Sequence, residues 1–253
     1  MNSSNTHLVL IPSFNPGMKV KNTVLEALQY WSPVWVVVDG SNDGSKELLE
    51  ELALSESGLK VVALPVNSGK GAAVLEGIKL AQQAGFTNVL TMDSDGQHPA
   101  YKIPEFMALS EASPGAMVLG VPDFGSEAPS LRVKGRKISN WWANLETFWM
   151  GIGDSLFGFR VYPIEPLCSI MENSRWMRRF DFDPEAAVRL CWAGVRPINV
   201  VAPVRYFSKA EGGVSHFHYF RDNKLLTWMH TRLVIGMFLR LPVIAYRKYW
   251  SSR

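Results

Sequence analysis

The chain of 253 residues has few cysteines and no long hydrophobic run. Its two cysteines, Cys168 and Cys191, lie in apolar segments, which favours reduced core thiols over a disulfide or a metal site. No apolar run reaches the ~18–20 residues that a membrane span needs. Residues 1–6 lack the basic and apolar pattern of a secretion signal, so we expect a cytoplasmic protein. The net charge of +3 is too small to indicate nucleic-acid binding.

The common nucleotide and calcium motifs are also missing. No G-x-G-x-x-G follows the first apolar segment, which argues against a dinucleotide-binding dehydrogenase. Residues 65–73 superficially match a P-loop, but the first glycine of that motif is absent and Gly71 replaces its Ser or Thr. Residues 93–104 do not form a calcium loop, because His98 and Pro104 stand where glycine and glutamate are needed.

What is present is a regular alternation of apolar and amphipathic segments over the first 121 residues. A hydrophobic content of 47% predicts a globular protein with a sizeable core. The alternation predicts an α/β fold, with a mostly parallel central sheet and helices on both faces. The expected strands cover 7–12, 34–38, 59–64, 88–92 and 116–120, and the expected helices cover 20–31, 45–54, 71–84 and 104–110. Beyond these we expect helices over 138–150, 164–172, 184–193 and 222–241, strands over 155–162 and 197–206, and loops over 125–135 and 209–215.

The most informative segment is an acidic pair that follows a buried strand. Asp93 and Asp95 stand one residue apart, and Gly96 and Pro99 then end the regular structure. At the carboxyl edge of an open α/β sheet, where ligands sit, two crowded carboxylates repel each other unless a cation holds them. Oxygen ligands suit Mg²⁺ or Mn²⁺, so the pair indicates a hard divalent cation and a phosphate-bearing substrate.

A second predicted strand also ends in a carboxylate. Asp39 is followed by Gly40, and such a carboxylate can accept hydrogen bonds from a base or a ribose. We therefore interpret Asp39 as functional. Asp43 is instead interpreted as a cap of the helix over 45–54.

Taken together, four motifs at strand ends resemble glycosyltransferase family 2, in order and in spacing. The nearest similarity is to the synthases that move sugars onto polyprenyl phosphates. The motifs cover residues 12–15, 39–44, 67–71 and 93–98, and the pattern continues in 154–160 and 182–185. The resemblance implies a GT-A fold and inverting transfer from a UDP- or GDP-linked sugar. It also implies a catalytic domain over 1–221, with a nucleotide-binding half (1–121) and an acceptor half (122–221).

The resemblance implies roles for particular residues. Those expected to line the nucleoside pocket are Pro12, Phe14, Asn15, Asp39 and Lys70. Those expected to hold Mg²⁺ or Mn²⁺ against the diphosphate are Asp93, Asp95 and Gln97. A cationic loop carrying Arg132 and Arg136 closes over the same phosphates or is simply a solvated basic surface.

Two further acids are candidates for a catalytic role. If the acceptor is a hydroxyl, a carboxylate must take its proton, and Asp154 and Glu185 stand where the family places acidic residues. Asp154 is alternatively a cap or an ion-pair partner of Arg160, and Glu185 is alternatively a first-turn helix residue. His216 and His218 are interpreted as acceptor contacts or exposed residues rather than a metal site.

The C-terminal residues 222–253 predict an amphipathic helix with a basic, aromatic tail. Such a helix lies on a membrane surface or packs on the core or on a partner. We expect a glycosyltransferase at the inner face of the cytoplasmic membrane, with a lipid-linked or polyprenyl-phosphate acceptor. Two alternatives stay open: a soluble enzyme of the same family with a small-molecule or carrier-bound acceptor, and a catalytically silent sugar-nucleotide-binding protein. A sugar nucleotidyltransferase is disfavoured, because residues 12–15 are not rich in glycine and arginine.

Overall fold

The computed structural model describes residues 2–124, 130–205 and 219–250. At its centre is a seven-stranded sheet in the order β5-β4-β2-β6-β8-β7-β9, and only β8 runs antiparallel to its neighbours. Its strands are β2 (His7–Ser13), β4 (Val34–Asp39), β5 (Leu59–Leu64), β6 (Asn88–Thr91), β7 (Met117–Asp123), β8 (Arg160–Pro163) and β9 (Pro197–Pro203). A small second sheet, which the sequence did not predict, pairs β1 (Asn2–Ser3) with β3 (Trp31–Ser32).

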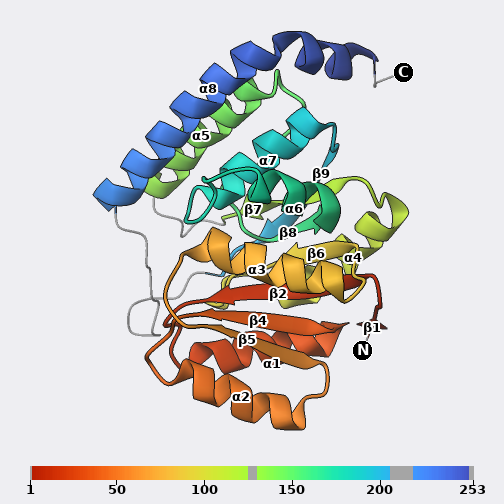
Figure 1. Cartoon of the computed structure of the whole chain (residues 1–253), viewed down its shortest axis with the longest axis vertical. Helices are drawn as coiled ribbons and strands as arrows, with labels where there is room; N and C mark the ends of the chain where they lie inside the picture. The colour runs from red at the N-terminus through yellow and green to blue at the C-terminus, as the bar shows by residue number, and fades with distance from the viewer. Residues whose placement is uncertain (1, 125–129, 206–218, 251–253) are drawn as a thin grey trace.

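Helices cover both faces of the large sheet (Figure 1). They are α1 (Lys19–Tyr30), α2 (Ser45–Ser55), α3 (Lys70–Gln83), η1 (Ala100–Lys102), α4 (Ile103–Ala112), α5 (Ser130–Glu146), α6 (Ile164–Glu172), α7 (Phe182–Ala193) and α8 (Tyr219–Trp250). Strand β2 shows how one strand serves two cores. Leu8 and Leu10 join the core under α3, α6 and α7, whereas Val9 and Ile11 join the core under α1, α2 and α4. The expected α/β architecture is therefore confirmed.

Two local predictions in the second half are wrong. The expected loop over 125–135 is helical from Ser130 onward, as the start of α5. Gly135 lies on the exposed side of that helix, where glycine costs only about 1 kcal/mol. The expected strand over 155–162 shrinks to β8, because the carboxylate of Asp154 accepts the main-chain N–H groups of Leu156 and Phe157.

The C-terminal helix α8 runs alongside α5 at one end of the molecule and is longer than predicted (Figure 1). One side of it packs on the core, where Met229, Leu233, Met237 and Ile244 are buried. The other side stays exposed. In the described parts of the chain, no helix is both long and apolar enough to cross a lipid bilayer.

Candidate active site

The four strand-end motifs meet at one edge of the sheet. Strands β5, β4, β2 and β6 are consecutive neighbours and run parallel, so the segments that follow them leave from the same side. The fold thereby brings together side chains from residues 13–98. This edge is the place where α/β sheets bind ligands.

Asp39 holds the segment after β5 in place. Its Oδ1 accepts the N–H of Ser68 at 2.8 Å, and its Oδ2 accepts the N–H of Gly69 at 2.7 Å. The side chain is buried, and both oxygens serve the turn that leads into α3. Gly40 packs so closely on this turn that a Cβ there would lie 2.4 Å from the main-chain nitrogen of Asn67. Asp39 therefore shapes the loop that delivers Lys70.

Asn15 ties the motif after β2 to the one after β4. Its main-chain N–H donates to Ser41 Oγ at 3.0 Å, and its side chain exchanges hydrogen bonds with Asn42 at 3.0 and 2.9 Å. The φ of +45° at Asn15 falls in the left-handed region, which asparagine tolerates better than most residues. Asp43 Oδ1 accepts hydrogen bonds from the N–H and the hydroxyl of Ser45, the first residue of α2, but the N-cap position of that helix is Gly44 and not Asp43 as predicted.

A buried lysine links two carboxylates at the centre of the edge. Lys70 Nζ lies 2.7 Å from Asp93 Oδ1 and 2.7 Å from Asp183 Oδ2. Burial by itself would lower the pKa of Lys70, but the two carboxylates outweigh it and raise that pKa. Burial likewise opposes ionisation of Asp93, yet the charge of Lys70 dominates and lowers the pKa of Asp93 to about 2. Both groups are therefore charged at neutral pH.

Asp95, the second acid of the pair, is in the opposite situation. Burial and the nearby charge of Asp93 raise its pKa. Its Oδ1 accepts the main-chain N–H of Gln97 at 3.0 Å. The negative charges of Asp93 and Asp95 repel each other, and a bound divalent cation would offset this repulsion. Such an ion is commonly bound by one or two carboxylates plus substrate phosphates and water.

This donor set fits Mg²⁺ or Mn²⁺. Among the described residues, no group of three or more His, Cys, Asp or Glu side chains is placed to hold a metal by itself. Asp93 and Asp95 would supply carboxylates, and the remaining ligands would come from the substrate and water. Gln97 contributes here through its main chain, which also accepts the N–H of Arg205, and side-chain ligation by Gln97 stays a prediction.

His98 is a structural member of the site that the sequence analysis did not single out. Its Nδ1 accepts the main-chain N–H of Asp93 at 3.0 Å, and its Nε2 lies 3.6 Å from Asp93 Oδ2. The ring packs edge-on against Phe157, with centroids 4.8 Å apart. Burial lowers its pKa. His98 thus fixes the turn that carries both aspartates.

Asp183 is the more important omission. It lies in the first turn of α7 and is 5% exposed, and its Oδ2 pairs with Lys70. Its Oδ1 is buried and has no hydrogen-bond partner among the described residues. A signal was available, because Asp183 belongs to the same 182–185 motif as Glu185. The choice of Glu185 over Asp183 depended on the resemblance and not on geometry.

The two acids that were singled out are both buried and fully engaged. Asp154 Oδ1 accepts from Arg136 at 2.5 Å, and its Oδ2 accepts from Asn140 at 3.0 Å. Glu185 pairs with Arg189 at 2.7 Å and with both terminal nitrogens of Arg232 at 3.1 and 3.0 Å. Their catalytic role stays a prediction, and in this structure each holds neighbouring elements together.

One suggested pairing is corrected. The expected alternative partner of Asp154 was Arg160, but Arg160 donates to the main-chain oxygen of Asp154, and the carboxylate pairs with Arg136. Arg136 is consequently already paired, within helix α5. The side chain of Arg132 and the whole of His216 and His218 lie outside the described residues.

The remaining predicted residues are placed as follows. Pro12 is buried at the end of β2, and Phe14 follows that strand half-buried. The acidic pair and Lys70 thus lie at the carboxyl ends of parallel strands, where open α/β sheets bind their ligands. The chain belongs to Glycosyl transferase family 2, whose family model matches residues 8–170.

Relatives of this chain include sugar transferases. Polyprenol monophosphomannose synthase of Mycolicibacterium smegmatis is 27% identical over 225 residues, which cover 82% of this chain and 79% of the relative. Undecaprenyl-phosphate mannosyltransferase of Micrococcus luteus is 25% identical over 225 residues, which cover 82% and 88%. Putative glycosyltransferase CsbB of Bacillus subtilis is 32% identical over 105 residues, but this match spans 39% of this chain and only 31% of that relative.

Solved structures of similar fold confirm the GT-A architecture. Glucosyl-3-phosphoglycerate synthase from Mycobacterium tuberculosis, crystallised with Mn²⁺, uridine-diphosphate-glucose and phosphoglyceric acid, aligns with a TM-score of 0.57 and 18% identity. That alignment covers 95% of this chain and 80% of that one. S. aureus TarS in complex with UDP-GlcNAc aligns with a TM-score of 0.54 and 16% identity, covering 93% and 72%.

Proposed function

We propose that this chain is a metal-dependent, inverting glycosyltransferase that moves a sugar from a UDP- or GDP-linked donor to a lipid-linked or polyprenyl-phosphate acceptor. The observation that carries the proposal is the convergence of Asp93, Asp95, Lys70 and Asp183 at one sheet edge. The polyprenyl-phosphate substrates in the names of two relatives support the acceptor class.

The nucleotide-binding half, residues 1–121, holds the donor. Pro12 lies near the end of β2, Phe14 and Asn15 follow that strand, and Asn15 contacts the motif after β4. We assign the nucleoside to this corner. Asp39 acts there through the loop that it holds, because both of its oxygens already accept main-chain N–H groups. Lys70, delivered by that loop, provides a fixed positive charge for the diphosphate.

Asp93 and Asp95, with Gln97 beside them, would hold Mg²⁺ or Mn²⁺. When bound, the ion would act as a Lewis acid that neutralises the charge building on the leaving nucleoside diphosphate. The chain's own contribution is orientation: His98 fixes the turn of the acidic pair, and Lys70 places a second cation next to Asp93.

The acceptor half, residues 122–221, contributes the acids of the reaction. Asp183 is the best placed, because its buried Oδ1, which has no hydrogen-bond partner among the described residues, would accept the hydrogen of a substrate hydroxyl. If the acceptor is a hydroxyl, this oxygen takes its proton as the sugar is transferred. A phosphate acceptor is already ionised and needs no base, and Asp183 then orients a hydroxyl of the donor sugar. Asp154 and Glu185 act as positioning residues.

Contact with a membrane surface belongs to the same proposal. The C-terminal half of α8 exposes large apolar side chains between basic residues. The exposed ones are Ile235, Phe238, Leu239, Val243 and Tyr246. Flotation with acidic liposomes compares the full chain with one in which Phe238 and Leu239 are both changed to Ser. Equal binding of the two proteins would contradict membrane contact through α8.

The reaction is tested with radiolabelled UDP- and GDP-sugars, undecaprenyl phosphate and Mn²⁺, followed by lipid extraction. We expect label in the lipid phase, dependent on the metal and lost in Asp95→Ala. Label that appears only on water-soluble acceptors would favour the soluble family-2 alternative. Nucleotide binding without transfer to any acceptor would favour the silent sugar-nucleotide-binding alternative.

A further inference from the structure

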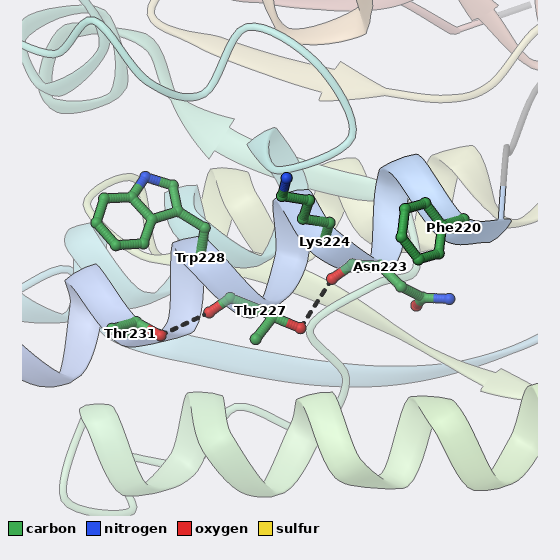
Figure 2. A pocket seen from close by; sticks show the side chains of 6 residues that line it. All are labelled: Phe220, Asn223, Lys224, Thr227, Trp228 and Thr231. Carbon is green, nitrogen blue, oxygen red and sulfur yellow. Dashed lines mark hydrogen bonds between the residues drawn. The ribbon is translucent and has the colours of Figure 1, made fainter.

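A shallow groove runs along the first turns of α8. Figure 2 shows its six lining side chains, all on this one helix: Phe220, Asn223, Lys224, Thr227, Trp228 and Thr231. Its volume is about 510 Å³, and it is open to solvent rather than enclosed. Phe220, Lys224 and Trp228 are four residues apart, so they form one row along the helix.

The groove is more apolar than its residue types suggest. Thr227 Oγ1 donates to the main-chain oxygen of Asn223 at 2.8 Å, and Thr231 Oγ1 donates to that of Thr227 at 2.9 Å. Both hydroxyl protons are therefore used within the helix, as Figure 2 shows. The largest surfaces left are aromatic, because Phe220 is 85% exposed and Trp228 is 50% exposed. A ligand in the groove would therefore contact mainly the rings of Phe220 and Trp228.

Positive charge accompanies this apolar surface. Lys224 lies in the groove, and Arg175 lies over the ring of Trp176 at 4.8 Å. Neither cation has a carboxylate partner among the described residues, so both keep their charge for a ligand. Arg232, in contrast, is neutralised by Glu185. The combination of an apolar track with free cations is complementary to an anionic amphiphile.

Contacts lead from the groove to α7, the helix that carries Asp183. The ring of Trp228 meets that of Trp176 edge-on, with centroids 6.5 Å apart. Arg232 lies over the same Trp176 ring at 3.9 Å and binds Glu185. Glu185 follows Asp183 by two residues on α7, and Asp183 binds Lys70. Helix α7 therefore carries both Glu185, which the contacts of the groove reach, and Asp183, which binds Lys70.

We propose that this groove binds the apolar chain of the acceptor, an amphiphile with an anionic head, and that Lys224 and Arg175 attract this anion to the protein before its head reaches the candidate active site. The proposal rests on the proposed function, since it names the part of the chain that takes the lipid acceptor. The occupant of the groove is the acceptor's own hydrocarbon chain, and not the bilayer or a second copy of the protein.

Binding of dodecyl phosphate, kept below its micelle concentration, tests the groove without turnover. We expect Trp228→Ala and Phe220→Ala each to raise its Kd by roughly tenfold, the effect of losing one aromatic contact. Lys224→Gln should weaken the binding of dodecyl phosphate. It should leave unchanged the binding of dodecyl maltoside, which has no charge. Trp141→Ala is the matched control, because Trp141 is 52% exposed on α5 and also meets another tryptophan edge-on.

Equal Kd values of Trp228→Ala and Trp141→Ala for dodecyl phosphate would contradict the proposed binding in the groove. A second result would also contradict the proposal: the wild type sediments as a dimer, and Trp228→Ala sediments as a monomer that still binds dodecyl phosphate with the wild-type affinity. A failure of the proposed function gives a different result. The groove variants would bind dodecyl phosphate more weakly, as expected, but the wild type would transfer sugar to no lipid phosphate. With prenyl phosphates of 15 and 55 carbons, Trp228→Ala should raise KM for the longer chain and leave kcat within twofold.

Discussion

Arg232 on α8 and Glu185 on α7 form a bidentate ion pair, with nitrogen–oxygen distances of 3.1 and 3.0 Å. Glu185 is completely buried, and Arg189 donates to the same carboxylate at 2.7 Å. The pair fastens the C-terminal helix to the helix that carries Asp183. Helix α8 is therefore part of the frame of the candidate active site.

Removing the charge of Glu185 tests whether this acid is structural. Glu185→Gln leaves Arg232 and Arg189 without a counter-charge, and breaking a buried ion pair typically costs about 3–5 kcal/mol. We expect a loss of that size in the free energy of unfolding, measured with urea. A variant that keeps its stability but loses turnover would instead identify Glu185 as a catalytic residue.

Asp183 should be needed for turnover more than for stability. Asp183→Asn weakens the hold on Lys70 and on a substrate hydroxyl, and a hydrogen bond to a charged group contributes about 1.5–3 kcal/mol. We expect kcat/KM to fall roughly 10- to 100-fold. Asp181→Asn is the matched control, because Asp181 is also buried but accepts main-chain N–H groups of Met177 and Arg179. Asp181→Asn should lower the stability and leave kcat unchanged. A larger loss of kcat in Asp181→Asn than in Asp183→Asn would refute the role assigned to Asp183.

Metal-dependent nucleotide binding should depend on Asp95. Thermal shift with UDP, GDP and CDP, each with and without Mn²⁺, should show one nucleotide that stabilises the wild type only with the metal. A ligand at 100 times its Kd adds about 2.7 kcal/mol, which is roughly 5–10 °C for a chain of this size. Asp95→Ala should lose this shift. Glu105→Ala, which removes a partly exposed acid on α4, should keep it.

Alkaline pH should expose the burial of Cys191. Burial raises the pKa of this thiol to about 12, above its ordinary value near 9. Between these values the unfolded chain loses a proton that the folded chain keeps, so stability falls as pH rises, by up to about 1.4 kcal/mol per pH unit. Cys191→Ala should make the decline between pH 9 and 11 shallower by one proton. An unchanged slope would show that the thiol is accessible, and Ellman's reagent would then react with it in the folded protein.

The regular half of the fold was readable from the sequence, since each strand and helix there has its own periodic pattern. The valine-rich β4 and the alternating surface of α2 are examples. Strand β8 was overestimated, because the carboxylate of Asp154 captures main-chain groups through contacts that no periodicity encodes. The start of α5 was missed, because Gly135 and the charged residues around it are typical of a loop.

The sequence by itself determined that carboxylates and a lysine follow parallel strands, and with it the chemistry available at the sheet edge. Composition and order along the chain are sufficient for this, since strand direction sends those segments to one side. Only the tertiary structure decided which acids have both oxygens paired with other residues. Asp154 and Glu185 are occupied by arginines from α5, α7 and α8, whereas Asp183 keeps one oxygen unpartnered among the described residues. The reason is that the partners of a buried charge come from residues distant in sequence, and packing alone brings them together.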